Sequence, residues 1–98
     1  MTAKRLFLAP RARRDLDDIA AYTEQEWGLA RRNAYLSNLI ETLEHLRVSS
    51  ALGRNRDGIR PGLHSFPSGR HIIFYRHSDE NLEVIRILHQ AMEKENHL

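Results

Sequence analysis

The sequence predicts an α+β fold of two layers, with an N-terminal strand, an antiparallel helix hairpin and an antiparallel β-meander in that order. In the first half, apolar residues recur every three or four positions, which is the period of an amphipathic helix. Gly28 divides this stretch, and glycine is the residue that most often ends a helix. In the second half, short runs of β-branched and aromatic residues alternate with turn residues, as in strands joined by hairpins. Helices and strands in separate blocks are typical of α+β proteins.

The first helix is expected to follow a strand at residues 4–9. Pro10 suits the first helical turn, where its missing N–H has no partner, and the helix is predicted to run to about Trp27. Its apolar face consists of Leu16, Ile19, Ala20, Thr23 and Trp27. We interpret Trp27 as a core anchor. Three arginines near the start of this helix (Arg11, Arg13 and Arg14) each have an acid four residues later (Asp15, Asp17 and Asp18), so this face is predicted to be solvated and paired within the helix.

A second helix is expected over residues 29–47. Its apolar stripe consists of Leu36, Leu39, Ile40, Leu43 and Leu46. Two amphipathic helices joined by a glycine fold back on each other as an antiparallel hairpin. Residues 48–59 show no period and are predicted to form an irregular loop. Strands are expected at residues 64–66, 71–77 and 82–89, and residues 90–98 are expected to be a short helix or a disordered tail.

Composition sets limits on the class of protein. The 98 residues are expected to form a single domain, residues 1–98, and their hydrophobic content of 41% with 29% charged residues lies in the globular range. Because the chain has no cysteine, disulfides and thiolate metal sites are excluded. The N-terminal apolar run, residues 6–10, is too short for a signal peptide or a membrane span. We therefore expect a cytoplasmic protein that is not bound to a membrane.

A basic stretch occupies the start of the C-terminal half. Residues 54–76 carry five arginines and one acid, Asp57, a net charge of +4 against +2 for the whole chain. A surface of this kind favours an acidic partner if the side chains face outward.

Strand alternation divides the meander into two faces. We assume a two-residue turn at Ser68-Gly69 and a four-residue connection at residues 78–81, and these lengths decide which residues lie opposite each other. Directly opposed residues share a face of the sheet. One predicted face holds Leu63, Ile72, Phe74, Ile85 and Ile87, with Arg76 opposite Glu83. The other holds His64, Phe66, His71, Ile73, Tyr75, Val84, Arg86 and Leu88. We expect the helices to bury the aliphatic face and to leave the mixed face open for a protein partner. The alternative is that the tail or residues 48–59 cover it.

The candidate acid–base groups are few. His64, His71, Tyr75, Arg86 and His89 lie on or near the expected open face, but none has a paired carboxylate in its pattern. No third ligand joins the histidines, so neither a metal site nor a cofactor is predicted. Stacking of single-stranded RNA on Phe66 and Tyr75 beside Arg86 is a weaker alternative to protein binding.

Several short strings carry a family resemblance. They are Leu8-Ala9-Pro10-Arg11-Ala12, Asp15-Leu16-Asp17-Asp18-Ile19, Trp27-Gly28, Ile59-Arg60-Pro61-Gly62-Leu63, Gly69-Arg70-His71, Phe74-Tyr75-Arg76 and Arg86-Ile87-Leu88-His89. With the order of elements, they resemble the ParE toxins of the RelE/ParE superfamily over essentially the whole chain.

The resemblance implies the toxin of a type II toxin–antitoxin module, which inhibits DNA gyrase by protein contact and is neutralised by a ParD-like antitoxin. It also implies a toxin–antitoxin hetero-oligomer that meets DNA only through the antitoxin. The related RelE branch cleaves messenger RNA on the ribosome with basic groups, of which only Arg86 maps well onto this chain.

Three functions follow from these observations. The first is a non-enzymatic gyrase inhibitor, with antitoxin or target contacts at Arg60, His64, Phe66, Tyr75, Arg86 and His89 and with no catalytic residue. The second is a ribosome-dependent endoribonuclease that uses Arg86 with Tyr75 or His89. The third is a non-toxic remnant that binds only an antitoxin.

Overall fold

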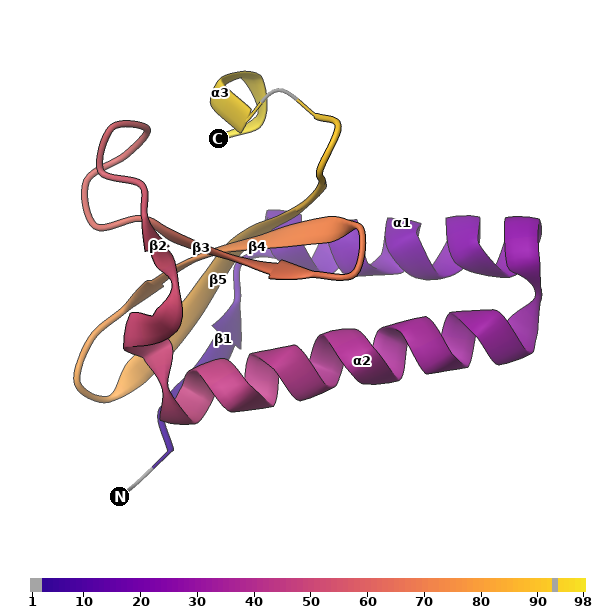
Figure 1. Cartoon of the computed structure of the whole chain (residues 1–98), viewed down its shortest axis with the longest axis horizontal. Coiled ribbons are helices and arrows are strands. Elements are labelled where there is room, and N and C mark those ends of the chain that lie inside the picture. Colours follow the sequence, from indigo (N-terminus) through magenta and orange to yellow (C-terminus); the bar gives the residue numbers. More distant parts are fainter. Residues whose placement is uncertain (1–2, 93) are drawn as a thin grey trace.

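The computed structural model describes residues 3–92 and 94–98 (Figure 1). Its elements are β1 (Arg5–Leu8), α1 (Pro10–Trp27), α2 (Leu29–Val48), the 3₁₀ turn η1 (Ser50–Leu52), β2 (Arg54–Asn55), β3 (His64–Ser68), β4 (His71–His77), β5 (Asn81–His89) and α3 (Lys94–His97). The predicted α+β order of strand, helix hairpin and meander is confirmed. The predicted loop at residues 48–59 is partly wrong, because it contains η1 and the edge strand β2.

The five strands form one sheet in the order β1-β5-β4-β3-β2. The meander supplies the antiparallel pairs, while β1 lies parallel to β5 at one edge. A parallel neighbour needs a long connection, and the helix hairpin is part of it. Within the described residues, no helix is long and apolar enough to cross a lipid bilayer.

The helix hairpin turns at Gly28, as predicted. Gly28 has φ +89°, which suits glycine, and its N–H donates to the carbonyl of Glu24 at 2.8 Å. The prediction for Trp27 is wrong, because 62% of this residue is exposed. Ile40 of the predicted second stripe is also exposed, whereas Leu39, Leu43 and Leu46 are buried.

Two local features change the predicted strand register. The β3–β4 turn is Gly69-Arg70, with Gly69 at φ +57°, so Ser68 lies opposite His71 and Phe66 opposite Ile73. In the β4–β5 pair, Arg76 lies opposite Glu83 and Tyr75 opposite Val84, as predicted. A β-bulge then shifts the register between Phe74 and Tyr75. A bulge inserts one residue into a strand and reverses the side of every residue beyond it.

The bulge decides which face each residue of β5 occupies. Phe74 lies opposite Arg86, and Ile73 lies opposite Ile87. Ile87 therefore joins the face of Tyr75, whereas Arg86 moves to the face of Phe74. The predicted placement of Arg86 beside Tyr75 is wrong for this reason.

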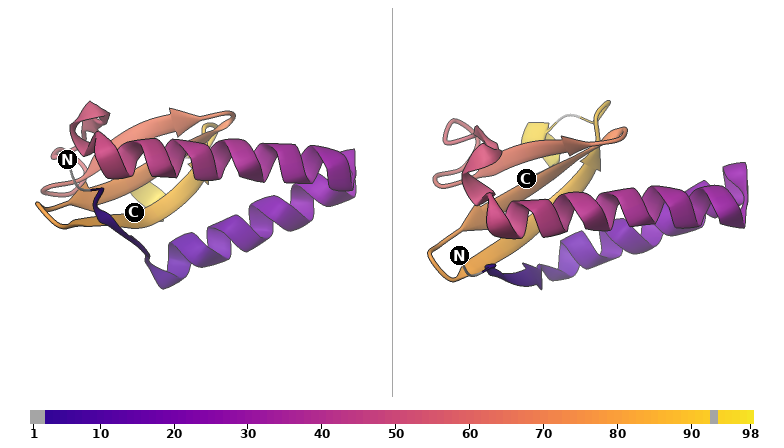
Figure 2. Two further views of the ribbon diagram at one scale, coloured as in Figure 1. Left: turned by 90° about the horizontal axis from the view of Figure 1, so that it is seen from below. Right: turned by 60° about the horizontal axis from the view of Figure 1, so that its bottom comes forward.

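The helices cover the face that the sequence analysis left open. Figure 2 shows α2 crossing one face of the sheet and α3 on the other side. The core under the helices consists of Ala12, Ile19, Leu39, Leu43, Leu46, Ile73, Tyr75, Leu82, Val84 and Ile87. The opposite face holds Leu63, Phe74 and Leu88, and partly buried Ile59 and Leu98 pack on it. The alternative, in which the tail or residues 48–59 cover the mixed face, is therefore also wrong, because the tail packs on the Phe74 face, which was predicted to lie under the helices.

Candidate protein-interaction surfaces

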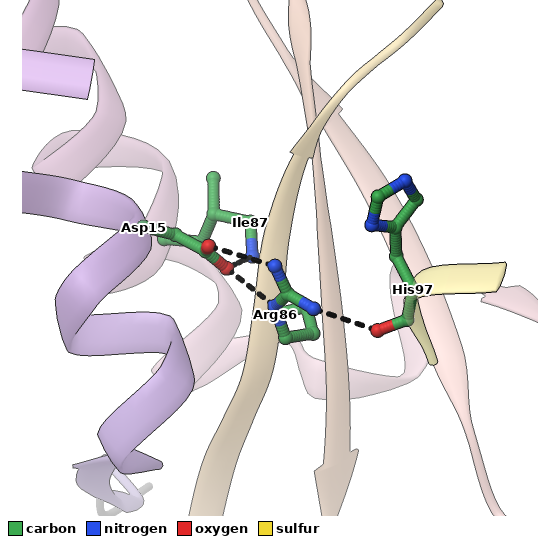
Figure 3. Close-up of polar contacts among 4 residues, drawn as sticks. All are labelled: Asp15, Arg86, Ile87 and His97. Atoms are coloured by element: carbon green, nitrogen blue, oxygen red, sulfur yellow. Dashed lines mark hydrogen bonds and ion pairs between the residues drawn. The ribbon is translucent and has the colours of Figure 1, made fainter. Parts of the chain in front are cut away.

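Arg86 is committed to an ion pair inside the fold (Figure 3). Its Nε and Nη2 donate to the two carboxylate oxygens of Asp15 at 2.7 and 2.9 Å, and the side chains are only 10% and 13% exposed. The N–H of Ile87 donates to the same carboxylate at 2.9 Å. The bidentate hydrogen bond to Asp15 raises the pKa of Arg86. Asp15 therefore joins α1 to β5, and its predicted pairing with Arg11 within the helix is wrong.

The tail lies on the Phe74 face of the sheet. Arg86 Nη1 donates to the carbonyl oxygen of His97 at 2.6 Å, as Figure 3 shows, and Arg60 Nη2 donates to the backbone oxygen of Leu98. The side chain of Leu98 packs against the apolar residues of that face. A small cavity of about 210 Å³ remains beside these contacts.

Tyr75 is buried and makes hydrogen bonds within the fold, so its side chain is not accessible to a partner. The residue has no exposed surface; its hydroxyl donates to the carbonyl of Ser50 at 2.6 Å and accepts the N–H of Gly53 at 3.0 Å. Burial raises the pKa of Tyr75. Tyr75 thereby anchors η1, which follows α2, to the middle of the sheet.

His64 and His77 lie next to Tyr75 at one end of the sheet. The ring of His64 lies 5.6 Å from that of Tyr75 and 4.8 Å from that of His77. His77 Nδ1 and the Ser50 hydroxyl are 3.1 Å apart, and burial together with His64 lowers the pKa of His77. The half-buried Phe66 packs against the helix-side core.

His71 and His89 lie opposite each other near the other end of the sheet. Their ring centroids are 5.4 Å apart. The hydroxyl of Tyr35 accepts the N–H of Arg70 at 3.0 Å and lies 2.5 Å from His71 Nδ1. Burial, and secondarily His89, lowers the pKa of His71 to about 4. At neutral pH His71 is therefore uncharged, and a hydrogen bond joins its Nδ1 to the Tyr35 hydroxyl.

The predicted acid–base groups do not lie together in one site. Arg86 and Tyr75 point to opposite faces of the sheet, and each is held by partners within the fold. A nuclease centre that combines Arg86 with Tyr75 is therefore not assembled. Over residues 3–92 and 94–98, no group of three or more histidine, aspartate or glutamate side chains is placed to hold a metal ion.

The free end of the helix hairpin extends beyond the sheet, as Figures 1 and 2 show. Tyr35 on α2 lies beside the end of the sheet, where its hydroxyl accepts the N–H of Arg70 in the β3–β4 turn. Beyond this point no other described helix or strand lies beneath the two helices, as Figures 1 and 2 show. We call the end of the hairpin, residues 22–34, the overhang. Its large apolar residues Tyr22, Trp27 and Leu29 are 63%, 62% and 55% exposed.

Two contacts order the overhang. The guanidinium of Arg31 lies 5.5 Å from the centre of the Trp27 ring, and Arg32 pairs with Glu24 at 3.3 Å between the two helices. Sequence reasoning missed this surface because it assigned Trp27 to the core. The available signal was length: a helix of 18 residues extends about 27 Å, longer than a strand of seven.

A groove of about 470 Å³ lies between α2 and the β3–β4 hairpin. Glu41 and His45 from α2 line it on one side, with Phe66 and Pro67 on the other. The hydroxyls of Thr42 and Ser68 are hydrogen-bonded across it at 3.0 Å.

The six predicted contact residues do not form one patch. Arg60 lies with the tail, His64 and Phe66 lie on β3, and His89 ends β5. These four keep part of their surface accessible, whereas Tyr75 and Arg86 are buried. Contact of any of the six with a partner stays a prediction.

Comparisons with known proteins agree with the fold. A family model described as the ParE toxin of the type II toxin–antitoxin system parDE matches residues 6–94. The chain is 38% identical over 91 residues to Toxin ParE1 of Caulobacter vibrioides, covering 93% of this chain and 94% of that protein. It is 33% identical over 97 residues to Toxin ParE1 of Mycobacterium tuberculosis, covering 98% and 99%.

Two solved structures share the fold at 18% sequence identity. The chromosomal ParDE system of P. aeruginosa matches with a TM-score of 0.76 over 89% of this chain and 96% of that chain. The RelBE2 toxin–antitoxin complex of M. tuberculosis matches with a TM-score of 0.61 over 91% and 100%. The matched family and the curated relatives are named as toxins. The chain belongs to the ParE toxin family of the parDE type II toxin–antitoxin systems.

Proposed function

We propose that this ParE-family toxin inhibits DNA gyrase by protein contact and that a ParD-like antitoxin neutralises it. The toxin and antitoxin form a hetero-oligomer in the cytoplasm, and the complex meets DNA through the antitoxin. The chain itself makes and breaks no covalent bond.

The overhang is the observation that carries this proposal. Exposed tryptophan, tyrosine and arginine side chains are enriched at the energetic centres of protein interfaces. Arg31 lies over Trp27, and with Tyr22 both belong to a two-helix projection that no other part of the described chain covers. A rigid projection of this kind loses little conformational entropy on binding.

The predicted contacts Arg60, His64, Phe66 and His89 are proposed to extend the binding surface along the sheet. Tyr75 and Arg86 are proposed to support it indirectly. Tyr75 fixes the position of η1, and Arg86 holds α1 against β5. Substitution of either residue is expected to alter binding through the fold.

The test uses purified chain in two parallel assays. In a gyrase supercoiling assay, we expect inhibition that is reversed by the antitoxin encoded beside this gene. In a translating-ribosome assay, we expect messenger RNA to stay intact at the same toxin concentration. Cleaved message with normal supercoiling would support the endoribonuclease and overturn the proposal. No effect in either assay, with antitoxin binding retained, would identify a non-toxic remnant.

A further inference from the structure

Arg31 lies over the indole ring of Trp27 on the overhang. The carbon of its guanidinium is 5.5 Å from the centre of the ring, within the range of a cation–π contact. The two residues come from different helices, since Trp27 ends α1 and Arg31 lies in the first turn of α2. The ring therefore covers one face of the planar guanidinium, while the N–H donors along the edge of the guanidinium point away from the ring.

Arg31 has no carboxylate partner within the part of the chain that the structure describes. The ion pairs among residues 3–92 and 94–98 do not include it. The overhang contains two acids, and one of them, Glu24, is paired with Arg32. The other, Glu26, forms none of these ion pairs. No carboxylate of the described chain therefore competes with a partner for Arg31.

The neighbouring Arg32 is used inside the hairpin. Its Nη1 lies 3.3 Å from Glu24 of α1, and its Nε is buried without a hydrogen-bond partner in the described structure. An ion pair between the two helices fixes the start of α2 relative to the end of α1, and so helps to hold Arg31 over Trp27. Arg32 therefore acts within the fold, whereas Arg31 is available to a partner.

A partner that covers Trp27 must also cover Arg31. Both residues are exposed in the free chain, where water solvates the guanidinium. Contact with the ring removes part of this water, and a desolvated guanidinium without an acceptor is strongly unfavourable. A carbonyl accepts a hydrogen bond but leaves the charge unbalanced. A carboxylate accepts two hydrogen bonds from the guanidinium edge and also balances its charge.

We propose that the overhang binds a site on gyrase in which an apolar pocket receives Trp27 and a carboxylate beside that pocket pairs with Arg31. The exposed Tyr22 and Leu29 require apolar surface around the carboxylate, which a protein offers and a DNA backbone does not. The carboxylate therefore belongs to an aspartate or glutamate of the enzyme. The inference deepens the proposed function and rests on it, since gyrase is the partner. Arg31 is then a specificity residue, because it disfavours apolar pockets that lack an acid.

Trp27 is the only tryptophan of the chain, so it reports on its own site. Incorporation of 5-fluorotryptophan gives the full chain a single fluorine-19 resonance in nuclear magnetic resonance spectra. Titration with purified gyrase holoenzyme in the absence of DNA should remove the free resonance, because the bound indole tumbles slowly with the large enzyme. A short DNA duplex without gyrase should leave the resonance unchanged.

Substitutions of Arg31 test for the carboxylate. Arg31→Gln should raise the dissociation constant for gyrase at least about 30-fold, because one partner of a buried charge pair is lost. Arg31→Glu should weaken binding by about a further 10-fold, because two carboxylates then repel each other. Arg31→Lys should weaken binding about 10-fold, because it keeps the charge but loses the planar fork. The matched control is Arg13→Gln, which removes an exposed arginine of α1 outside the overhang and should not alter binding.

The possible outcomes separate this inference from the proposed target. Equal affinities of Arg31→Gln and Arg31→Glu would overturn the inference, because no carboxylate would then face Arg31. Loss of the resonance with DNA alone, or on concentrating the chain alone, would also overturn it, because a phosphate or a second copy would then be the occupant. Inhibited supercoiling with an unchanged resonance contradicts the inference and keeps gyrase as the target. An unchanged resonance without inhibition contradicts the proposed target, and the inference with it.

Discussion

Arg86 on β5 and Asp15 on α1 lie 71 positions apart in the sequence and form a bidentate ion pair at 2.7 and 2.9 Å. The carboxylate also accepts the N–H of Ile87, so one side chain satisfies a guanidinium and the backbone of the neighbouring strand residue. This pair holds the first helix against the strand at the centre of the fold.

Removal of either partner should therefore destabilise the protein strongly. We expect Asp15→Asn to lower the free energy of unfolding by about 3 kcal/mol, because it leaves a nearly buried guanidinium without its counter-charge. The exposed pair of Arg76 and Glu83 is the control, and Arg76→Gln should cost less than about 1 kcal/mol. Urea unfolding of the two variants checks this. Similar losses in both would show that the pair does not hold α1 to β5.

Tyr75→Phe tests the internal bond to the 3₁₀ turn. The substitution removes a hydroxyl and leaves the buried Ser50 carbonyl and the Gly53 N–H without their partner, so we expect a loss of about 1–3 kcal/mol. Tyr22→Phe is the matched control, because Tyr22 is largely exposed. Hydrogen exchange at the Gly53 amide should accelerate in Tyr75→Phe alone. Unchanged exchange would contradict the assigned hydrogen bond.

Gly53 should tolerate no larger side chain. A Cβ at this position would lie 2.1 Å from the Tyr75 hydroxyl oxygen, so Gly53→Ala must displace the tyrosine and is expected to cost about 1–3 kcal/mol. Gly58→Ala provides the control, because a Cβ there meets no atom within 4 Å. Thermal unfolding of the two variants distinguishes them. Equal melting temperatures would show that Tyr75 is not fixed beside Gly53.

Acid should destabilise the protein through His71. Its pKa is lowered from 6.5 to about 4, mainly by burial, so the unfolded chain binds more protons than the folded one between these two values. The stability that neutral His71 provides is present above pH 6.5 and is lost as the pH falls towards 4. His71→Asn keeps an acceptor for Tyr35 but cannot be protonated. Urea unfolding at pH 7 and pH 5 measures the free energy of unfolding that is lost on acidification, and this loss should be smaller for His71→Asn than for the wild type. The control is His45→Asn, because His45 is exposed, and it should lose as much as the wild type. An equal loss in all three proteins would contradict the role of His71.

The order of elements was predictable because it depends on local signals. The period of the apolar residues, Pro10 and Gly28 act within a few positions, and they place both helices within one residue of their observed ends. The pairing of Arg76 with Glu83 was also predictable, because it lies next to the connection that sets its register.

The faces of the sheet were not predictable, because one bulged residue reverses every position beyond it. The bulge beside Phe74 leaves no mark in the alternation of residues, yet it moves Arg86 to the tail side and Ile87 to the helix side. The Asp15–Arg86 pair and the exposure of Trp27 depend in turn on where the sheet lies relative to the helices. The candidate site therefore required the three-dimensional arrangement, whereas the fold class did not.

Inhibition of gyrase supercoiling, compared between two double variants, tests the central claim most directly. Trp27→Ala with Leu29→Ala removes exposed apolar groups from the overhang, whereas Val48→Ala with Leu52→Ala removes exposed apolar groups elsewhere. Loss of about 2 kcal/mol of contact energy at the overhang corresponds to roughly a 30-fold weaker inhibitor. We predict that weakening for the overhang variant and wild-type inhibition for the control. Equal inhibition by both variants, with circular dichroism confirming that each is folded, would contradict the claim that the toxin contacts gyrase through its overhang.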